Sequence, residues 1–83
     1  MPSYISFTNK TTYPVISVYS DEELVADAVT KDTKTKLFAI NSGTVEFTVR
    51  ENSEKNLYSV WIPLYPNESY SLIIKNNTAY FEK

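Results

Sequence analysis

Apolar and polar residues alternate with a period of two along most of this chain. In the clearest example, Val45, Phe47 and Val49 alternate with threonine, glutamate and arginine. Successive side chains of a β-strand point to opposite faces of its sheet, so this pattern predicts a strand with one buried face. No segment keeps a 3.6-residue apolar period over three turns, and β-branched and aromatic residues are enriched throughout. The pattern therefore predicts an all-β protein.

Polar turns divide the chain into seven or eight short strands. The segment 24–29 contains two alanines and would suit a short helix, but its length and its turn-rich flanks favour a strand. Asn9 begins a polar turn after the first strand, and Asp21 begins an acidic turn after the second. We expect strands at residues 4–8, 15–20, 24–29, 37–40, 44–50, 57–65, 70–75 and 78–82, and a polar loop at residues 51–56.

Two turns carry residues that tolerate a positive backbone φ angle. Gly43 is the only glycine of the chain and follows Asn41 and Ser42. We expect it to adopt a positive φ in a turn, with a hairpin following. Asn76 and Asn77 separate the last two strands, and this pair predicts a type I′ turn.

The segment from Leu64 to Tyr70 has the spacing of a tyrosine corner, with Pro66 four residues ahead of the tyrosine. In Greek-key sandwiches such a tyrosine lies at the connection between the two sheets, and its hydroxyl bonds to backbone a few residues upstream. We expect Tyr70 to be largely buried and to bond the backbone of residues 64–67. Together with the short strands, this motif predicts a small immunoglobulin-like Greek-key β-sandwich.

The chain of 83 residues is expected to form a single domain over residues 1–83. A domain of this size buries only roughly 60% of the surface that its unfolded chain exposes, so its stability margin is thin. The chain has no cysteine, so packing must supply the stability that disulfides supply in other small domains. The residues expected in the core share one face of each strand: Ile5, Phe7, Ile16, Val18, Val45, Phe47, Val49, Val60, Ile62, Leu72 and Ile74.

Charge and hydropathy argue against two classes of partner. The net charge is −2 and the signs are mixed along the chain, so no broad positive field attracts nucleic acid or an anionic membrane. The longest apolar runs fall far short of the about 20 residues that span a bilayer. The first residues enter a strand pattern at once and lack the basic and apolar segments of a secretory signal. We therefore expect no nucleic acid, no membrane insertion and, by default, a cytoplasmic location.

The side chains that most enzymes use are missing or scattered. The chain has neither histidine nor cysteine, which removes the usual general base and the commonest zinc ligands. A carboxylate pair for glycoside hydrolysis or a weak calcium site would have to come from Asp21, Glu22, Glu23 and Asp27. A turn followed by a strand offers little cleft, and the spacing of a calcium loop is absent. We interpret these carboxylates as a solvated surface and expect no enzyme, cofactor or metal.

The order of these features resembles a bacterial family catalogued as domain of unknown function 4397, a small immunoglobulin-like or transthyretin-like sandwich. The resemblance covers roughly residues 4 to 75, through the segments 5–9, 15–19, 24–26, 42–50 and 64–70. The chain has Asp21-Glu22 and Asn67 where the family usually has glycine. Members of the family are often exported and occur beside surface modules, so the resemblance implies a role at the cell surface.

The segment 57–65 is apolar on both faces of its expected strand. We expect its even-numbered residues to face the core, which leaves Leu57, Trp61 and Tyr65 outside together with Pro63. Exposed apolar clusters of this kind mark contact surfaces. The alternative is that the opposite face lies inside, or that loops and the last strand cover the tryptophan. Proline cannot donate to a ladder, so this strand is expected to be an edge strand or to be bulged.

Two functions fit these observations. The first is a non-enzymatic structural or protein-interaction module that binds a protein partner, or a second copy of itself as a homodimer, through Leu57, Trp61 and Tyr65 or through an edge strand. The second is a carbohydrate-binding module, in which exposed Trp and Tyr rings stack on sugars. A continuous apolar patch favours the first, whereas a planar row of rings with polar groups between them favours the second. We favour the protein-interaction module.

Overall fold

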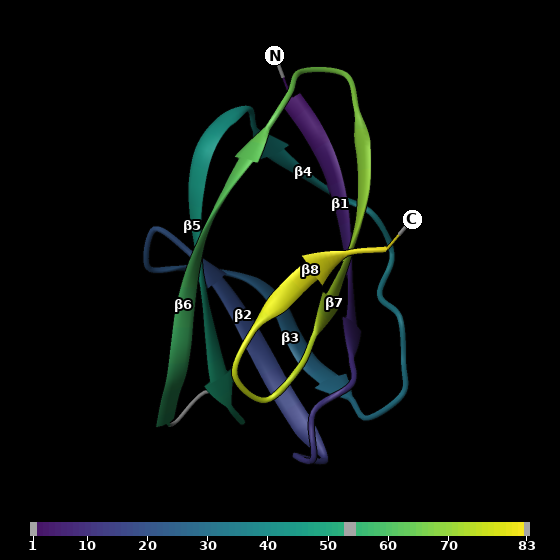
Figure 1. The fold of residues 1–83 in the computed structure, drawn as a ribbon, viewed down its shortest axis with the longest axis vertical. Helices are drawn as coiled ribbons and strands as arrows, with labels where there is room; N and C mark the ends of the chain where they lie inside the picture. The colour runs from purple at the N-terminus through teal and green to yellow at the C-terminus, as the bar shows by residue number, and fades with distance from the viewer. Residues whose placement is uncertain (1, 53–54, 83) are drawn as a thin grey trace.

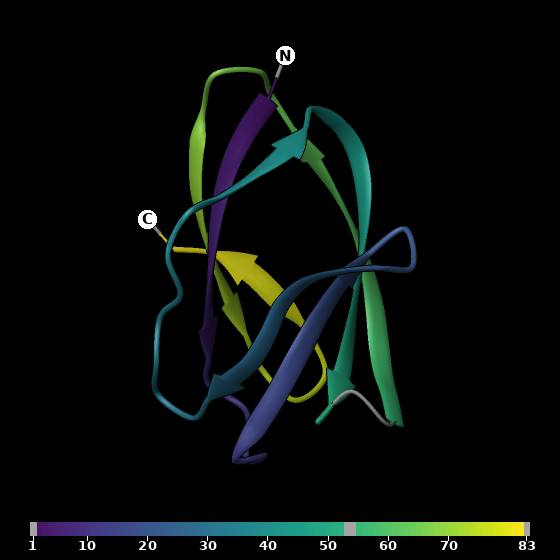
Figure 2. The same ribbon diagram turned by 180° about the vertical axis from the view of Figure 1, so that it is seen from behind.

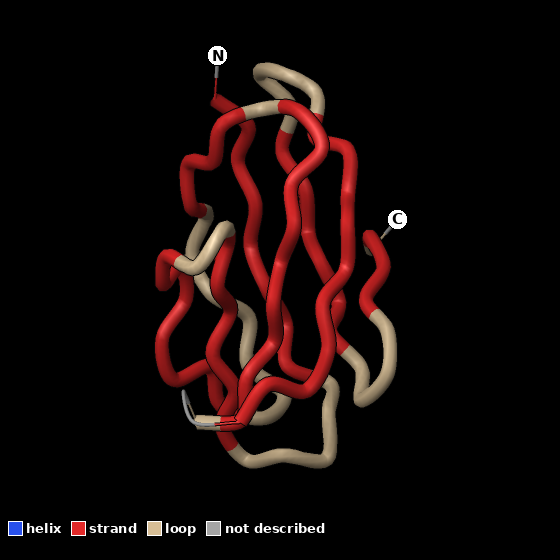
Figure 3. The backbone as a smooth tube through the Cα atoms, turned by 90° about the vertical axis from the view of Figure 1, so that its left-hand side faces the viewer, coloured by secondary structure: helices blue, strands red, loops and turns tan. Residues whose placement is uncertain are grey.

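The computed structural model describes residues 2–52 and 55–82, and these residues form two packed sheets of four strands each (Figures 1 and 2). The strand order is β4-β1-β7-β8 in one sheet and β3-β2-β5-β6 in the other. Within the described ranges the backbone consists of strands and loops, without a helix (Figure 3). The strands are β1 Pro2–Asn9, β2 Val15–Ser20, β3 Glu23–Thr30, β4 Phe38–Asn41, β5 Gly43–Glu51, β6 Lys55–Leu64, β7 Ser69–Ile74 and β8 Ala79–Phe81. The prediction of a small all-β sandwich is confirmed.

The chain changes sheet repeatedly, as the connections of a Greek-key sandwich do. Hairpins join β2 to β3, β5 to β6 and β7 to β8, whereas the β1–β2, β3–β4, β4–β5 and β6–β7 connections cross between the sheets. Near the two ends of the chain, β1 pairs in parallel with β7, with Ile5 opposite Tyr70 and Phe7 opposite Leu72. The first strand therefore lies inside its sheet, between β4 and β7.

The inward faces of the two sheets form one apolar core. Phe7 and Phe47 meet across it in an edge-to-face contact, with ring centroids 5.6 Å apart. Of the predicted core residues, all but Val60 are buried, and Val60, on the edge strand β6, is half-buried. The core also contains Ala26, Val29 and Leu64. In β5 burial follows the two-residue period, so its core face could be assigned from the alternation, whereas β1, β2 and β7 contain runs of consecutive buried residues.

The turns confirm one prediction and correct another. Gly43 has the positive φ expected of it, at 119°, but its turn joins β4 of one sheet to β5 of the other, and the hairpin that follows is β5–β6. Asn76 and Asn77 have no positive φ, so the predicted type I′ turn between β7 and β8 is wrong. Asn76 instead exchanges two hydrogen bonds with Thr12, accepting from its backbone N–H and donating to its hydroxyl. A contact with a distant loop thus fixes this turn.

A two-residue turn with positive φ occurs at Asp21 and Glu22, where φ is 49° and 71°. Ser20 and Glu23 pair directly on either side of it, as in a type I′ hairpin. The predicted polar loop at residues 51–56 is shorter than expected, because β5 reaches Glu51 and β6 begins at Lys55. Residues 53–54 of that loop lie outside the described residues.

Asn9, which was expected to begin a polar turn, is buried instead, together with Thr11. The Asn9 side chain is fully buried at the end of β1 and donates to the carbonyl oxygens of Val29, at 2.9 Å, and Tyr13, at 3.3 Å. Its own Oδ1 accepts from the backbone N–H and the hydroxyl of Thr11. This side chain therefore links the β1–β2 crossover to the end of β3.

The tyrosine corner forms as its spacing predicts. The Tyr70 hydroxyl accepts a hydrogen bond of 2.9 Å from the backbone N–H of Tyr65, within the predicted segment. The Tyr70 ring stacks on Phe81 with centroids 4.8 Å apart, and it is half-buried where burial was expected to be nearly complete. The corner spans the β6–β7 connection, where the chain passes from one sheet to the other.

Replacing Tyr70 with phenylalanine is expected to lower the free energy of unfolding by about 1 kcal/mol, because the Tyr65 N–H loses its acceptor while the ring stack stays. Urea denaturation of the two proteins measures the difference. An unchanged unfolding midpoint would show that water replaces the hydroxyl without cost.

Candidate contact surface on strand β6

Strand β6 is the edge of its sheet and pairs with β5 alone. Val45 lies opposite Ile62, and Ile62 and Leu64 are buried against the core. The residues that alternate with them point away from the core. Trp61 is 65% exposed and Pro63 is exposed as well. The prediction that this strand is an edge strand is confirmed.

Tyr65 continues the same alternation just beyond the end of β6. Its side chain is 66% exposed, but its backbone is held on both sides. The N–H donates to the Tyr70 hydroxyl, and the carbonyl accepts a 2.7 Å hydrogen bond from the Ser3 hydroxyl. Trp61, Pro63 and Tyr65 therefore form an exposed apolar row, which we call the β6 strip.

Leu57 does not belong to the β6 strip. The register shifts between Val49, which faces Tyr58, and Arg50, which faces Asn56, so Leu57 is the extra residue of a β-bulge. Leu57 is half-buried and packs against the core. The expectation that it is exposed beside Trp61 is therefore corrected. The bulge adds one residue to β6. Leu57 therefore does not point to the outer face that a strict alternation from Trp61 would give it.

The polar surroundings of Trp61 lie across the sheet, not along the strip. Glu46 is directly opposite Trp61 on β5, and Thr44 is opposite Pro63. The next pair toward the bulge is Thr48 and Ser59, whose hydroxyls lie 3.0 Å apart. The β6 strip is thus apolar along its length, with one polar row beside it.

The edge strands differ in how far they are protected against pairing. In the described part of the chain, β4 has four residues and β8 has three, while β3 pairs irregularly with β2. Strand β3 also carries Glu23 and Asp27 and a positive φ of 51° at Ala28. Strand β6 has ten residues, and Lys55 is its only charged residue. Charges, shortness and irregularity are the usual protections of an edge, so β6 is the least protected of the four.

Tyr58 closes the sandwich on the β6 side. Its hydroxyl lies 2.7 Å from the carbonyl oxygen of Lys75 and 2.8 Å from that of Thr78, and it donates its single proton to this pair. The contact ties β6 to the turn between β7 and β8, which belong to the other sheet. Desolvation by burial raises the pKa of Tyr58 from its ordinary 10.0 to about 12.

This pKa predicts a loss of stability at alkaline pH. Because the folded protein holds the Tyr58 proton more tightly than the unfolded chain, its contribution is complete below pH 10.0 and declines as the pH rises to about 12. We expect a loss of about 1 kcal/mol after allowing for partial exposure to solvent. Lysines also lose their protons in this pH range. Comparing the pH dependence of the free energy of unfolding in wild type and Tyr58→Phe isolates the contribution of Tyr58. Identical slopes above pH 10 would contradict the assignment.

The candidate carboxylates lie on the β2–β3 turn and along β3. Asp21 and Glu22 form the tight turn, and Glu23 and Asp27 are exposed on β3. Over residues 2–52 and 55–82, no three acidic side chains come close enough to hold a metal ion. Among the same residues there is no helix with the length and apolarity needed to cross a lipid bilayer.

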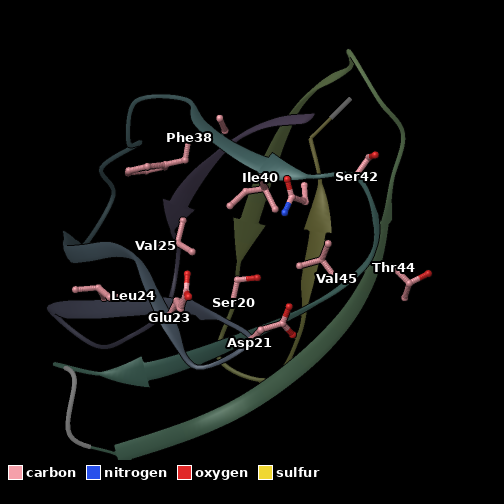
Figure 4. A pocket seen from close by; sticks show the side chains of 12 residues that line it. Ser20, Asp21, Glu23, Leu24, Val25, Phe38, Ile40, Ser42, Thr44 and Val45 are labelled. Carbon is pink, nitrogen blue, oxygen red and sulfur yellow. The ribbon is translucent and has the colours of Figure 1, made fainter. Parts of the chain in front are cut away.

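A second surface feature was missed by the sequence reasoning. A groove of about 600 Å³ opens between the free edges of β3 and β4, near the turns at Asp21 and Gly43 (Figure 4). Its walls come from the β2–β3 turn, from the start of β3, from β4 and from the start of β5. No local pattern could have revealed it, because these segments are distant in sequence and belong to different sheets.

No protein-family model matches the chain, and no curated protein is significantly similar to it. The resemblance to domain of unknown function 4397 stays a prediction.

Proposed function

We propose that this protein is a non-enzymatic interaction module that self-associates through the edge of β6. The observation that carries the proposal is the exposed, almost uncharged edge of this strand beside the β6 strip. An exposed hydrophobic edge strand presents unpaired N–H and C=O groups to another chain. A second copy of this chain carries the same edge and can satisfy the same groups through a two-fold axis.

The bulge and the proline restrict where two β6 strands can pair. Leu57 disrupts the ladder at one end, and Pro63 lacks an N–H at the other, which leaves residues 58–62 between them. Antiparallel pairing centred on Val60 places Ser59 opposite the second copy's Trp61. The two tryptophans then become diagonal neighbours, about 7–8 Å apart, within reach of each other's rings. Such a dimer covers apolar surface that each monomer exposes.

The carbohydrate-binding alternative draws on the same exposed rings. Trp61 and Tyr65 are four residues apart along an extended segment, which corresponds to roughly 13 Å. Pro63 lies between them, and the polar residues lie in a separate row on β5. A continuous apolar row favours a protein contact over a row of rings with hydroxyl-binding groups between them.

The test is the mass of the particle in solution as a function of concentration. We expect light scattering of the wild type to approach twice the mass of one chain, and Trp61→Lys to stay at one, because a charge at this position opposes edge pairing. Leu37→Lys is the matched control, since Leu37 is 53% exposed on the β3–β4 connection. That variant is expected to dimerise like the wild type.

A wild type that remains monomeric at millimolar concentration contradicts the proposal. If its Trp61 fluorescence then responds to added oligosaccharide, the carbohydrate-binding function replaces it. Equal loss of dimer in both lysine variants would show that association is non-specific and does not use β6.

A further inference from the structure

The groove between β3 and β4 has an apolar floor that the protein leaves partly uncovered. Val25, Ile40 and Val45 face the space between the two sheets (Figure 4). Val25 and Ile40 are half-buried, and Val45 is nearly buried, at 8% exposure. At this side of the sandwich Val25 and Ile40 thus stay partly open to solvent between polar residues of the rim, and an apolar side chain from outside can pack on them.

The rim of the groove is acidic. Asp21 and Glu23 line its β2–β3 side, and the remaining lining residues are uncharged. Both carboxylates are exposed, and the two ion pairs found among the described residues, Lys10–Asp32 and Lys34–Glu82, involve neither of them. The groove therefore favours an occupant that combines apolar groups with a positive charge.

The free edge of β4 gives the occupant its backbone partner. Strand β4 pairs with β1 along one side, from Ile5 opposite Phe38 to Pro2 opposite Asn41. It is the last strand of its sheet, so its other side offers unpaired N–H and C=O groups next to the groove. An extended peptide that adds to such an edge gains main-chain hydrogen bonds, and its alternate side chains enter the adjoining pocket.

We propose that the groove binds an extended segment of another polypeptide, with alternating apolar side chains and a lysine or arginine at one end. The segment adds to β4 as a fifth strand of the β4-β1-β7-β8 sheet. Its apolar side chains pack on Val25, Ile40 and Val45, and its basic residue lies beside Asp21 and Glu23. This site is separate from the β6 edge, because β4 and β6 end different sheets on opposite sides of the sandwich.

The experiment uses two blocked peptides as probes, both alternating valine and threonine, one flanked by lysines and one by glutamates. Each is titrated into isotope-labelled protein at low salt while amide NMR shifts are followed. We expect the lysine peptide to shift the amides of residues 21–25 and 38–41 and to bind at least about tenfold more tightly than the glutamate peptide.

The rim is tested with the double variant Asp21→Asn/Glu23→Gln. Asparagine is chosen because it tolerates the positive φ at position 21. We expect it to bind the lysine peptide about five- to tenfold more weakly. The control Glu51→Gln/Glu68→Gln removes the same net charge at positions that do not line the groove, and it is expected to bind like the wild type.

Three results would overturn the proposal. The first is equal affinity for the two peptides, and the second is an equal loss of affinity in both double variants, since each would mean that the acidic rim does not select the occupant. The third is a response of the groove amides to hexylammonium with none to either peptide. That response would make the groove a small-molecule site.

Discussion

Replacing Phe47 with alanine is expected to lower the free energy of unfolding by about 3–5 kcal/mol, the largest effect we predict for a single substitution. Phe47 is fully buried in the middle of β5, where its ring meets the edge of Phe7. The substitution removes this contact and leaves a cavity between two sheets that cannot close without breaking their pairing. Since small domains have only about 5–15 kcal/mol of stability in total, a large share of it would be lost.

Thermal and urea denaturation followed by circular dichroism measure this effect. Tyr80→Ala is the matched control, because this aromatic side chain is 49% exposed on the edge strand β8. We expect the control to change stability by about 0.5 kcal/mol or less. A Phe47→Ala protein that unfolds within 1 kcal/mol of wild type would show that Phe47 is not at the centre of the core.

Replacing Asn9 with alanine is expected to lower the free energy of unfolding by about 3 kcal/mol, although asparagine is a residue type that is common in turns. The change removes the donor to the carbonyl oxygens of Val29 and Tyr13 and the acceptor for two groups of Thr11. Each buried polar group left without a partner costs about 1–3 kcal/mol. The effect should therefore exceed that of deleting a solvent-exposed hydrogen bond.

The variant Asn9→Asp tests the side-chain N–H donor of Asn9 separately from the size of the side chain. Aspartate keeps the size and the acceptor, but at neutral pH it places a buried carboxylate against the Val29 carbonyl oxygen, so we expect a loss at least as large as with alanine. Asn76→Ala is the control, because its hydrogen bonds to Thr12 are exposed. If urea denaturation shows equal losses of unfolding free energy for the substitutions at Asn9 and Asn76, the larger contribution of the buried side-chain amide is refuted.

The sequence pattern predicted much of the candidate surface but misplaced one residue. Trp61 and Tyr65 are exposed, as the alternation along β6 indicates, because neighbouring residues in an extended chain face opposite ways. The same alternation would place Leu57 outside, but Leu57 is the extra residue of the bulge opposite Val49 and Arg50. A bulge depends on how two strands fit together, so the alternation within one strand could not reveal it.

The sequence by itself determined the fold class, the extent of most strands and the faces that they bury. These properties depend on the two-residue period and on local turn residues, which act over a few positions. The tyrosine corner was also readable, because Leu64, Pro66 and Tyr70 belong to one short segment. Its bond from Tyr65 to the Tyr70 hydroxyl spans only five residues.

Only the tertiary structure decided which strands are neighbours and which polar residues are buried. The parallel pairing of β1 with β7 joins residues more than sixty positions apart, and no local pattern encodes it. That pairing and the β1–β2 crossover place Asn9 inside the protein, where its amide binds backbone of β3. The same long-range arrangement makes β4 and β6 edge strands and opens the groove beside β4. Edges and grooves arise from the strand order of both sheets, so both proposed contact sites depend on the assembled fold.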